Sequence, residues 1–422
     1  IRMANLCIIS SHSVNGVAEI HSELLKTHLF KDFNDLYPNK FLNVTNGVTP
    51  RRWVHCAFRE LSDLLTKYYG NQDWLSEYSL LDNLYSQMQK SGDLESFLNE
   101  YKSAKLSAKK RLVKWVKEHS KQDIDDSFMF DVQVKRIHEY KRQFMNALYC
   151  VHKYLTLKSM SKEEREKQVK RATFFGGKAA PGYVVAKNTI KLINLIANVV
   201  NNDPDVNKYY KIVFLPDYKV SAAQIIIPAA DLSQHISTAG TEASGTSNMK
   251  FAMTGSLIIG TKDGANIEIA EQIGEENCFF FGNDVKAVEK YRAEMRSGKK
   301  FGPSDRLRNV FNTILSGRFG DIGFFRDYIN GLMNGNDYYL VLKDFDLYVD
   351  AQQKVDNLYR NYDEWCKKAI ISITKMGFFS SDRSIEDYCE KIWGVEAMEV
   401  SKPTSKSSER VISYGNLKCL NK

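Results

Sequence analysis

From Phe128 onward, short apolar segments alternate with helical patterns, and this alternation restricts the fold more than any other feature. Segments rich in β-branched and aromatic residues predict strands at Phe128–Val134, Ala172–Phe175, Lys211–Leu215, His235–Ser237, Leu257–Gly260 and Cys278–Phe281. Between them, helices are predicted at Ile137–Tyr154, Val184–Val200, Ala222–Ala229, Thr246–Met253 and Asn266–Ile273. Nearly continuous apolar strands that alternate with helices are typical of a parallel sheet covered on both faces. We therefore predict an α/β fold with a doubly wound, mostly parallel sheet, which would bind ligands at the carboxyl ends of its strands.

The segments outside this alternation predict additional helices and a tail. Residues 54–125 and 305–395 are mostly helical in pattern, and the last helix is expected at about 384–393. After Glu396 the composition turns to Ser, Lys and Pro, so residues 397–422 are expected to form a disordered tail.

Charge and composition restrict the partners of the 422-residue chain. Of the net charge of +8, +4 lies in residues 401–422, and the rest of the chain is close to balanced, so a nucleic-acid role receives little weight. No apolar run is long enough to cross a membrane, and no signal-peptide pattern is present. The seven cysteines are scattered without a metal-type spacing, which indicates reduced thiols, a cytoplasmic protein and no metal site.

The segment Glu242–Phe251 carries the strongest chemical signal. It places small hydroxyl residues and a glycine in one turn and Lys250 about one helical turn later. Unpaired N–H groups at such a helix start can hold an anion. A lysine just inside the helix can act as a cation, or as an amine that condenses with an aldehyde. The pattern favours a phosphorylated aldehyde cofactor such as pyridoxal phosphate, although an ordinary helix cap has the same composition.

A second cluster, Lys135–Arg142, follows a predicted strand directly. Lys135 and Arg136 would lie at the carboxyl end of that strand, and Lys141 about one and a half turns along the next helix. The charge run alone fits a solvated helix start better than a binding site. His138 is given no catalytic role, because a histidine at a helix start is more often structural. The segment Gly176-Gly177-Lys178 lacks the spacing of a Walker motif and predicts a tight turn near the site.

Together these motifs resemble those of the glycogen and starch α-glucan phosphorylases. The resemblance runs from about Arg2 to Val395, and it is strongest in Asn46–Trp53, Asp131–Arg142, Gly176–Tyr183, Ser237–Phe251 with Gly255, and Ile259–Glu268. Two residues depart from the family pattern, Thr254 and Ser256. Neither is expected to touch Lys250, so both are expected to matter little.

The resemblance implies the domain organisation. Family members have the GT-B glycosyltransferase fold, in which two Rossmann-like domains face each other across a cleft. Residues 1–46 would be the end of the N-terminal domain, and residues 47–396 the C-terminal domain that binds pyridoxal phosphate and phosphate. The abrupt start at Ile1 fits this reading. The N-terminal wall of the cleft would be absent, so residues 1–422 alone are expected to be inactive.

The resemblance also implies the role of each site residue. Lys250 would form the Schiff base with pyridoxal phosphate, while Lys135, Gly245, Thr246 and Ser247 would hold the cofactor phosphate. Lys135, Arg136 and Lys141 would form the catalytic group, and the last two would grip orthophosphate. The remaining matches are to the glucosyl site (Asn46, Glu242, Ser244 and Gly245), to tyrosines near cofactor and sugar (Tyr140 and Tyr218) and to an aromatic neighbour of the cofactor (Trp53). Core packing is nearly as good an explanation for these last three aromatic residues.

The activity implied is phosphorolysis of an α-1,4-glucan by orthophosphate to glucose 1-phosphate with retention of configuration, and the cofactor phosphate would relay the proton. The whole protein would be a homodimer in the cytoplasm, or in a plastid if the source is plant-like. Two alternatives remain open. A nucleotide-sugar glycosyltransferase of the same fold would not need the lysine motif, so an absorbance spectrum of bound pyridoxal phosphate distinguishes it. A remnant that keeps the cofactor pocket without activity is distinguished only by an activity assay.

Overall fold

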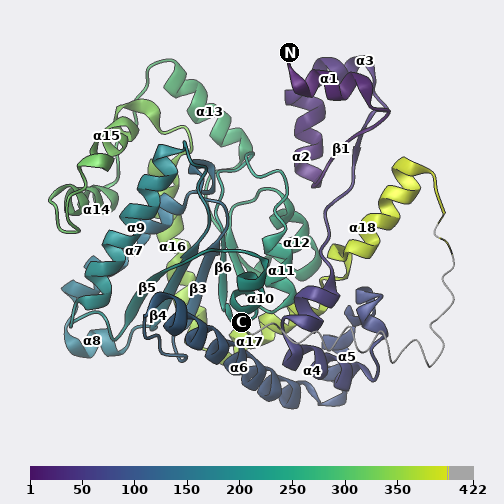
Figure 1. The fold of residues 1–422 in the computed structure, drawn as a ribbon, viewed down its shortest axis with the longest axis horizontal. Helices are drawn as coiled ribbons and strands as arrows, with labels where there is room; N and C mark the ends of the chain where they lie inside the picture. The colour runs from purple at the N-terminus through teal and green to yellow at the C-terminus, as the bar shows by residue number, and fades with distance from the viewer. Residues whose placement is uncertain (397, 399–422) are drawn as a thin grey trace.

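The computed structural model describes residues 1–396 and 398, and Figure 1 shows their arrangement. The tail predicted at 397–422 lies outside the described residues apart from Met398. The centre of the molecule is a six-stranded sheet whose neighbouring strands all pair in parallel. Its strands are β3 (Met129–Val134), β4 (Arg171–Gly176), β5 (Tyr210–Leu215), β6 (Leu232–His235), β7 (Leu257–Gly260) and β8 (Cys278–Phe280). The predicted α/β class with a parallel sheet is therefore confirmed.

The strand order creates a possible ligand-binding crevice at one edge of the sheet. The order is β5-β4-β3-β6-β7-β8, so the chain winds outward from β3 in one direction and then from β6 in the other. Parallel strands joined by right-handed crossovers put the two sets of connecting helices on opposite faces. The reversal between β3 and β6 leaves a crevice at the carboxyl ends of these two strands, which is where doubly wound sheets bind ligands.

Helices cover both faces of this sheet (Figure 1). On one side α7 (Gln143–Ser159) packs beside α9 (Val184–Asn202) and α16 (Val341–Tyr359). On the other, α10 (Val220–Ala229) packs beside α6 (Leu94–Ser120) and α11 (Ser247–Met253). The strands β3 and β4 are buried at every position, as expected for strands covered on both faces.

The remaining helices fall largely where the sequence predicts them. They are α4 (Arg59–Tyr69), α5 (Leu84–Ser91), α8 (Lys162–Glu166), α12 (Ala265–Ile273), α13 (Val285–Arg296), α14 (Asp305–Leu315), α15 (Gly323–Gly331), α17 (Tyr362–Thr374) and α18 (Ser381–Tyr388). The helical turns continue from α18 through Trp393, close to the predicted end of the last helix. Two of these helices, α8 and α13, were not predicted from the sequence. Over the described ranges, no helix combines the length and apolar character needed to cross a membrane, and no cluster of metal-binding side chains occurs.

One predicted strand is displaced. The structure places β6 at Leu232–His235 rather than at His235–Ser237. The polar residues Ser233 and Gln234 concealed the strand, because both are buried in it. Gln234 donates to Asp131 Oδ1 at 2.7 Å and accepts from the Tyr348 hydroxyl at 2.9 Å, so its amide is satisfied inside the fold.

The predicted start of the helix at Ile137 is also wrong. Residues Glu139–Lys141 form a single 3₁₀ turn, and α7 begins only at Gln143. The two are separated by Arg142, whose φ is +54°. The Arg142 guanidinium is fully buried, pairs with Asp344 at 2.6 Å and donates to the Ile236 carbonyl at 2.7 Å. These contacts hold the backbone in the left-handed conformation, so Lys141 lies before α7 rather than on it.

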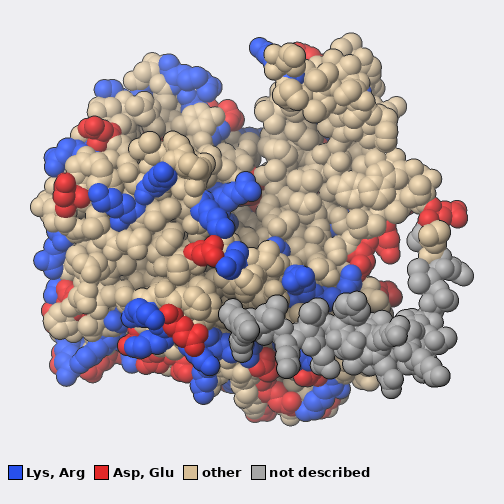
Figure 2. Space-filling model, in the orientation of Figure 1, with Lys and Arg blue, Asp and Glu red and all other residues tan. Residues whose placement is uncertain are grey.

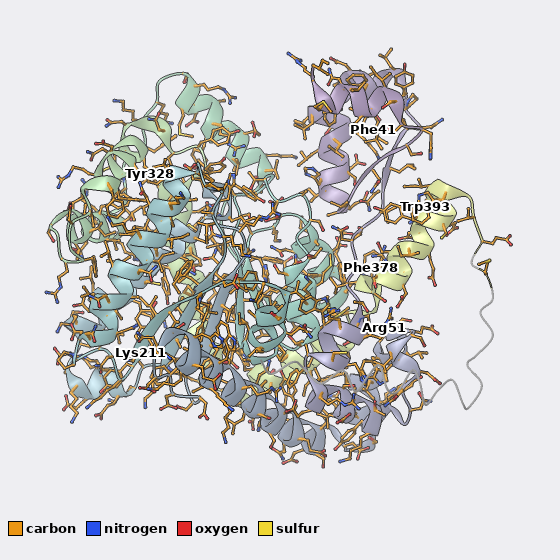
Figure 3. All side chains as sticks on the ribbon, viewed as in Figure 1. Phe41, Arg51, Lys211, Tyr328, Phe378 and Trp393 are labelled. Atoms are coloured by element: carbon orange, nitrogen blue, oxygen red, sulfur yellow. The ribbon has the colours of Figure 1, made fainter. Side chains whose placement is uncertain are left out.

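A small N-terminal lobe lies apart from the main sheet (Figure 1). Its elements are α1 (Met3–Ser10), β1 (Val14–Gly16), α2 (Glu19–Leu24), α3 (Lys31–Leu36) and β2 (Phe41–Asn43), and the two strands form a parallel pair that the sequence did not predict. The face of the lobe seen in Figure 2 is mostly uncharged. In Figure 3 its Phe41 lies across from Trp393, which is at the end of the last helical segment.

Residues 44–48 connect this lobe to the short helical segment Arg51–Cys56, and polar contacts hold them from two sides. On one side Glu268 of α12 accepts from the Thr45 hydroxyl at 2.5 Å and from the Glu19 N–H at 3.1 Å. On the other side Arg383 of α18 donates to the Thr45 carbonyl at 2.8 Å. A little further along the chain Arg51 pairs with Asp382 of α18, in the region labelled in Figure 3.

The sheet interior contains a charged cluster. Arg171 of β4 is fully buried, and its guanidinium lies 3.0 Å from Asp131 of β3 and 2.7 Å from Asp356 of α16. Lys153 of α7 reaches the same Asp356 at 3.0 Å. The cluster thus ties two neighbouring strands to two helices of one face.

Candidate active site

A cavity of about 430 Å³ lies at the carboxyl ends of β3 and β6, where the strand order reverses. Three segments bring most of its walls together: the end of β3, the loop between β6 and α11, and the turn that precedes α12. The predicted site residues among its lining are Asn46, Lys135, Lys141, Tyr218, Glu242, Ser244, Gly245, Thr246, Ser247 and Lys250. Residues that are distant in the sequence therefore meet at one site.

The loop between β6 and α11 presents backbone donors to this cavity. Gly245 has φ +78°, a left-handed conformation that side chains disfavour, and it turns the chain into α11. Within the described ranges, the N–H groups of Gly245, Thr246 and Ser247 have no protein acceptor. Adjacent unpaired N–H groups of this kind can bind the oxygen atoms of a phosphate.

Lys250 lies on α11 and its side chain lines the same cavity. Its Nζ is 4.2 Å from the ring centroid of Trp53, which belongs to the short helix η2 (Arg51–Cys56). Burial lowers the pKa of Lys250, which favours the neutral amine. A neutral amine is the form that attacks an aldehyde carbon.

A network of charges occupies the opposite wall. Lys141 Nζ lies 2.6 Å from Glu242 Oε2, and the Ser237 hydroxyl donates to the same oxygen at 3.1 Å. Burial raises the pKa of Glu242, but Lys135 and Lys141 outweigh that effect and the net pKa is lowered. The Tyr140 hydroxyl lies 3.5 Å from Glu242 Oε1. The 3₁₀ turn before α7 therefore directs both Tyr140 and Lys141 toward Glu242.

Lys135 and His235 form a pair that the sequence analysis missed. Lys135 Nζ lies 3.4 Å from His235 Nδ1, and His235 Nε2 lies 3.0 Å from the Ser233 hydroxyl. Burial, together with the neighbouring Lys135 and Lys141, lowers the pKa of His235 well below its usual value, so the ring is neutral and can accept from Lys135. Burial also lowers the pKa of Lys135 to about 8, although Glu242 opposes this shift.

Other lining residues were also missed, namely Thr261, Asp263 and Asn266. The first of them follows β7, so the rule that ligands lie at the carboxyl ends of strands was a usable signal. His235, at the end of β6, satisfied the same rule.

Three predicted site residues lie outside the cavity lining. Trp53 lies against Lys250, and Tyr140 lies beside Glu242 and Lys141, all three of these partners being lining residues. Arg136 is exposed, and its carbonyl accepts from Gln143 Nε2 at 2.9 Å. The predicted role of Arg136 in gripping orthophosphate therefore needs its side chain to turn toward the cavity.

Two further residues have the structural roles that the sequence analysis gave them. His138 caps the turn Glu139–Lys141, where its Nδ1 accepts from the Tyr140 N–H at 3.3 Å. Gly177 follows β4, and a Cβ at this position would lie 1.9 Å from the Lys135 carbonyl oxygen. Only glycine permits this approach, which sets the path of the backbone beside Lys135.

The donor set fits a phosphorylated aldehyde. One wall offers an amine of lowered pKa, the loop offers unpaired N–H groups, and Lys135 and Lys141 supply positive charge. Two anions repel strongly at contact distance in a site of low dielectric, so more than one cation is needed to hold a second anion beside a phosphate. Lys135 and Lys141 could meet this need.

Comparison with known proteins identifies relatives across nearly the whole chain. A family model described as carbohydrate phosphorylase matches residues 1–395. Cytosolic alpha-glucan phosphorylase 2 of Arabidopsis thaliana is 48% identical over 404 residues, which cover 95% of this chain and 47% of that relative. Glycogen phosphorylase 2 of Dictyostelium discoideum is 46% identical over 413 residues, which cover 98% of this chain and 41% of the relative.

A plastid relative also matches nearly the whole chain. The chloroplastic/amyloplastic alpha-1,4 glucan phosphorylase L-1 isozyme of Solanum tuberosum is 46% identical over 408 residues, which cover 95% of this chain and 42% of the relative. The chain thus spans about half the length of the curated relatives that it matches.

Proposed function

This chain belongs to the carbohydrate phosphorylase family, and on that premise we propose that it forms the cofactor and phosphate wall of an α-1,4-glucan phosphorylase. The reaction proposed is retaining phosphorolysis of a glucan by orthophosphate to glucose 1-phosphate. The observation that carries the proposal is the meeting of Lys250, the loop N–H groups and two cations in one cavity of about 430 Å³. A nucleotide-sugar glycosyltransferase would not need a half-buried lysine of lowered pKa at this position.

The proposed cofactor is pyridoxal phosphate, bound covalently to Lys250. When bound, it supplies a phosphate group that exchanges a proton with orthophosphate. The N–H groups of Gly245, Thr246 and Ser247, with Lys135, would hold that phosphate. Trp53 and Tyr218 would pack against the ring, since Trp53 already lies against Lys250 and Tyr218 lines the cavity. His235 would fix Lys135 by accepting one of its protons in a hydrogen bond.

The substrates would lie between the loop and the 3₁₀ turn. Orthophosphate would lie beside Lys141, and Arg136 would join it from the solvent side. Asn46, Glu242, Ser244 and Gly245 would contact glucosyl hydroxyls, which suits carboxylate and amide groups that accept and donate hydrogen bonds. Lys141 pairs with Glu242, so an anion bound beside Lys141 would share this lysine with the carboxylate.

The wider organisation is also proposed from the family. The whole protein would have the two-domain GT-B fold and form a homodimer, in the cytoplasm or, as for some relatives, in a plastid. Residues 1–46 would belong to one domain and residues 47–396 to the other. The strand order, with its reversal at β3 and β6, supports a Rossmann-like second domain.

A two-step experiment tests the function. The chain is first incubated with pyridoxal phosphate and its absorbance spectrum recorded. It is then assayed for glucose 1-phosphate from glycogen or starch and orthophosphate, both alone and joined to the part of the Arabidopsis relative that it does not match. We expect cofactor binding in both forms and sustained turnover in the joined form. Cofactor binding without turnover in the joined form would favour an inactive remnant, and no cofactor binding would favour the glycosyltransferase.

Arg136→Ala is expected to weaken orthophosphate binding by the cofactor-loaded chain at least tenfold and to leave cofactor binding unchanged. The reason is the loss of one charge-assisted contact, worth about 1.5–3 kcal/mol. Isothermal titration with orthophosphate measures the affinity, and the absorbance spectrum reports the cofactor. Arg308→Ala, an exposed arginine of α14, is the control. Normal phosphate affinity, or loss of the cofactor, would show that Arg136 does not have this role.

A further inference from the structure

The loop Gly240–Thr246 has no regular secondary structure, yet it carries four of the residues proposed to contact cofactor and sugar, namely Glu242, Ser244, Gly245 and Thr246. Its conformation must therefore be imposed by neighbouring residues. One carboxylate supplies much of that constraint. Asp263 Oδ2 accepts from the Thr241 N–H at 3.1 Å and from the Glu242 N–H at 2.8 Å. Asp263 is only 3% exposed and itself lines the cavity.

The residues after Asp263 complete the contact with the loop. The Ala265 N–H donates to the Ser244 carbonyl at 2.8 Å. Gly264 has φ +51°, and a Cβ there would lie 2.6 Å from the Ser244 oxygen and 2.9 Å from the Glu242 oxygen. The turn before α12 thus fits the loop closely at successive backbone positions, and only a residue without a side chain fits between them.

The same turn is fixed to the rest of the site. Asn266 Nδ2 donates to the His235 carbonyl at 3.2 Å and to the Thr261 carbonyl at 3.1 Å. Its Oδ1 accepts from Asn248 Nδ2 at 3.0 Å. Asn248 belongs to α11, the helix that carries Lys250. Asp263 is therefore held on a frame that includes both the end of β6 and the lysine helix.

We propose that Asp263 is the positioning residue that holds the loop Gly240–Ser244 and so directs the Glu242 carboxylate toward Lys141 and the sugar side of the cavity. What Glu242 binds rests on the proposed function, whereas the hold on the loop does not. Asp263 touches the loop backbone and acts through Glu242. Without the Asp263 acceptor, the N–H groups of Thr241 and Glu242 would need water, and the loop would separate from the turn.

The pKa of Asp263 helps to distinguish an effect on the loop from an effect on the stability of the whole fold. Burial raises the pKa of Asp263 to about 6, although backbone N–H groups from Glu242, Gly240, Thr241 and Gly264 oppose the shift. A carboxyl whose folded pKa lies above its unfolded value of about 3.8 favours folding when protonated, and this contribution is lost as the pH rises through about 6. At pH 7 the charge of Asp263 therefore does not stabilise the fold, so Asp263→Asn should not lower the melting temperature through loss of that charge.

Hydrogen–deuterium exchange of the purified 422-residue chain at pH 7 tests the proposal. Asp263→Ala removes the acceptor, and Asp263→Asn replaces one carboxylate oxygen by a nitrogen that cannot accept from the surrounding N–H groups of Glu242, Gly240, Thr241 and Gly264. In both variants we expect amide exchange in 240–245 to be at least tenfold faster than in the wild type, with unchanged exchange in β3. Asp337→Asn is a matched control, because Asp337 is a buried carboxylate whose pKa burial also raises to about 6 and which accepts from the N–H groups of Val341 and Leu342 at 2.8 Å. It should speed exchange at the start of α16 and not in the loop.

A second variant and a functional readout complete the test. Glu242→Gln keeps Asp263 and should leave the loop exchange at the wild-type rate. In the joined polypeptide, Asp263→Asn should raise KM for glucan while the cofactor absorbance stays unchanged. Unchanged loop exchange in folded Asp263→Asn would overturn the proposal, as would equal acceleration in β3. If Asp263→Ala does not fold, the Asn variant decides. Absence of a cofactor band in the wild type would refute the proposed function and leave the exchange result standing.

Discussion

Lys250→Ala is expected to abolish the absorbance band of the Schiff base between the chain and pyridoxal phosphate. The band requires an amine that reacts with the cofactor aldehyde, and Lys250 lines the cavity, with a pKa lowered by burial. Its Nζ lies 4.2 Å from the Trp53 ring centroid, which fixes the side chain within the cavity. The effect is complete rather than graded, because without the amine no covalent bond forms.

Borohydride reduction followed by peptide mapping gives the same answer independently. In the wild type the reduced cofactor should remain on the peptide that contains Lys250. Lys262→Ala is the matched control, since Lys262 is 52% exposed and pairs with Glu275 outside the cavity lining. A normal band in purified Lys250→Ala, or a label on another lysine, would contradict the assignment.

Arg171→Met is expected to cost about 3–5 kcal/mol of the free energy of unfolding, the largest stability effect of any substitution considered for this fold. The guanidinium is fully buried between Asp131 and Asp356. Its removal leaves two carboxylates in the interior with less compensation. Asp356 keeps Lys153, whereas Asp131 keeps, among the residues that the structure describes, only the amide of Gln234. Urea unfolding followed by circular dichroism measures the change.

An exposed pair provides the comparison. Arg306→Ala removes a guanidinium that is 39% exposed and lies 3.2 Å from Asp350, and it should cost no more than about 1 kcal/mol. Adding Asp131→Asn to Arg171→Met should recover part of the loss, because the unpaired charge is then gone. A cost below about 1 kcal/mol for Arg171→Met would mean that water or rearrangement compensates for the loss of the guanidinium.

Much of the sheet could be predicted because its strands are apolar and its helices amphipathic. β3, β4, β5, β7 and β8 were predicted to within one residue at each end, and all six strands of the sheet were anticipated. β6 was displaced because a strand in which Ser233 and Gln234 are buried carries no apolar signal. The N-terminal pair β1 and β2 was missed because three-residue strands leave too few positions for a period to be seen.

The candidate site, too, could be predicted only in part. Residues that belong to continuous motifs, such as Gly245, Thr246 and Lys250, could be named from sequence, and the structure places them in one cavity. Roles that arise from partners distant in the chain could not be. His235 becomes part of the site through Lys135, and Asp263 through the loop that it holds.

The exposed position of Arg136 and the position of Lys141 on a 3₁₀ turn could not be predicted either. The position of Lys141 depends on the backbone reversal at Arg142, which is stabilised by a buried pair with Asp344 more than 200 positions later in the chain.

The connection at residues 44–48 has a mechanical consequence. Thr45 is held from α12 by Glu268 and from α18 by Arg383, and the next residue, Asn46, lines the cavity. Any rotation of the N-terminal lobe about this joint therefore shifts Asn46 relative to Lys250. Because α12 begins just after Asp263 and carries Glu268 one turn later, a single rigid helix touches both the joint and the loop that presents Glu242. The distance between Asn46 and Glu242 across the cavity therefore depends on the angle of the lobe.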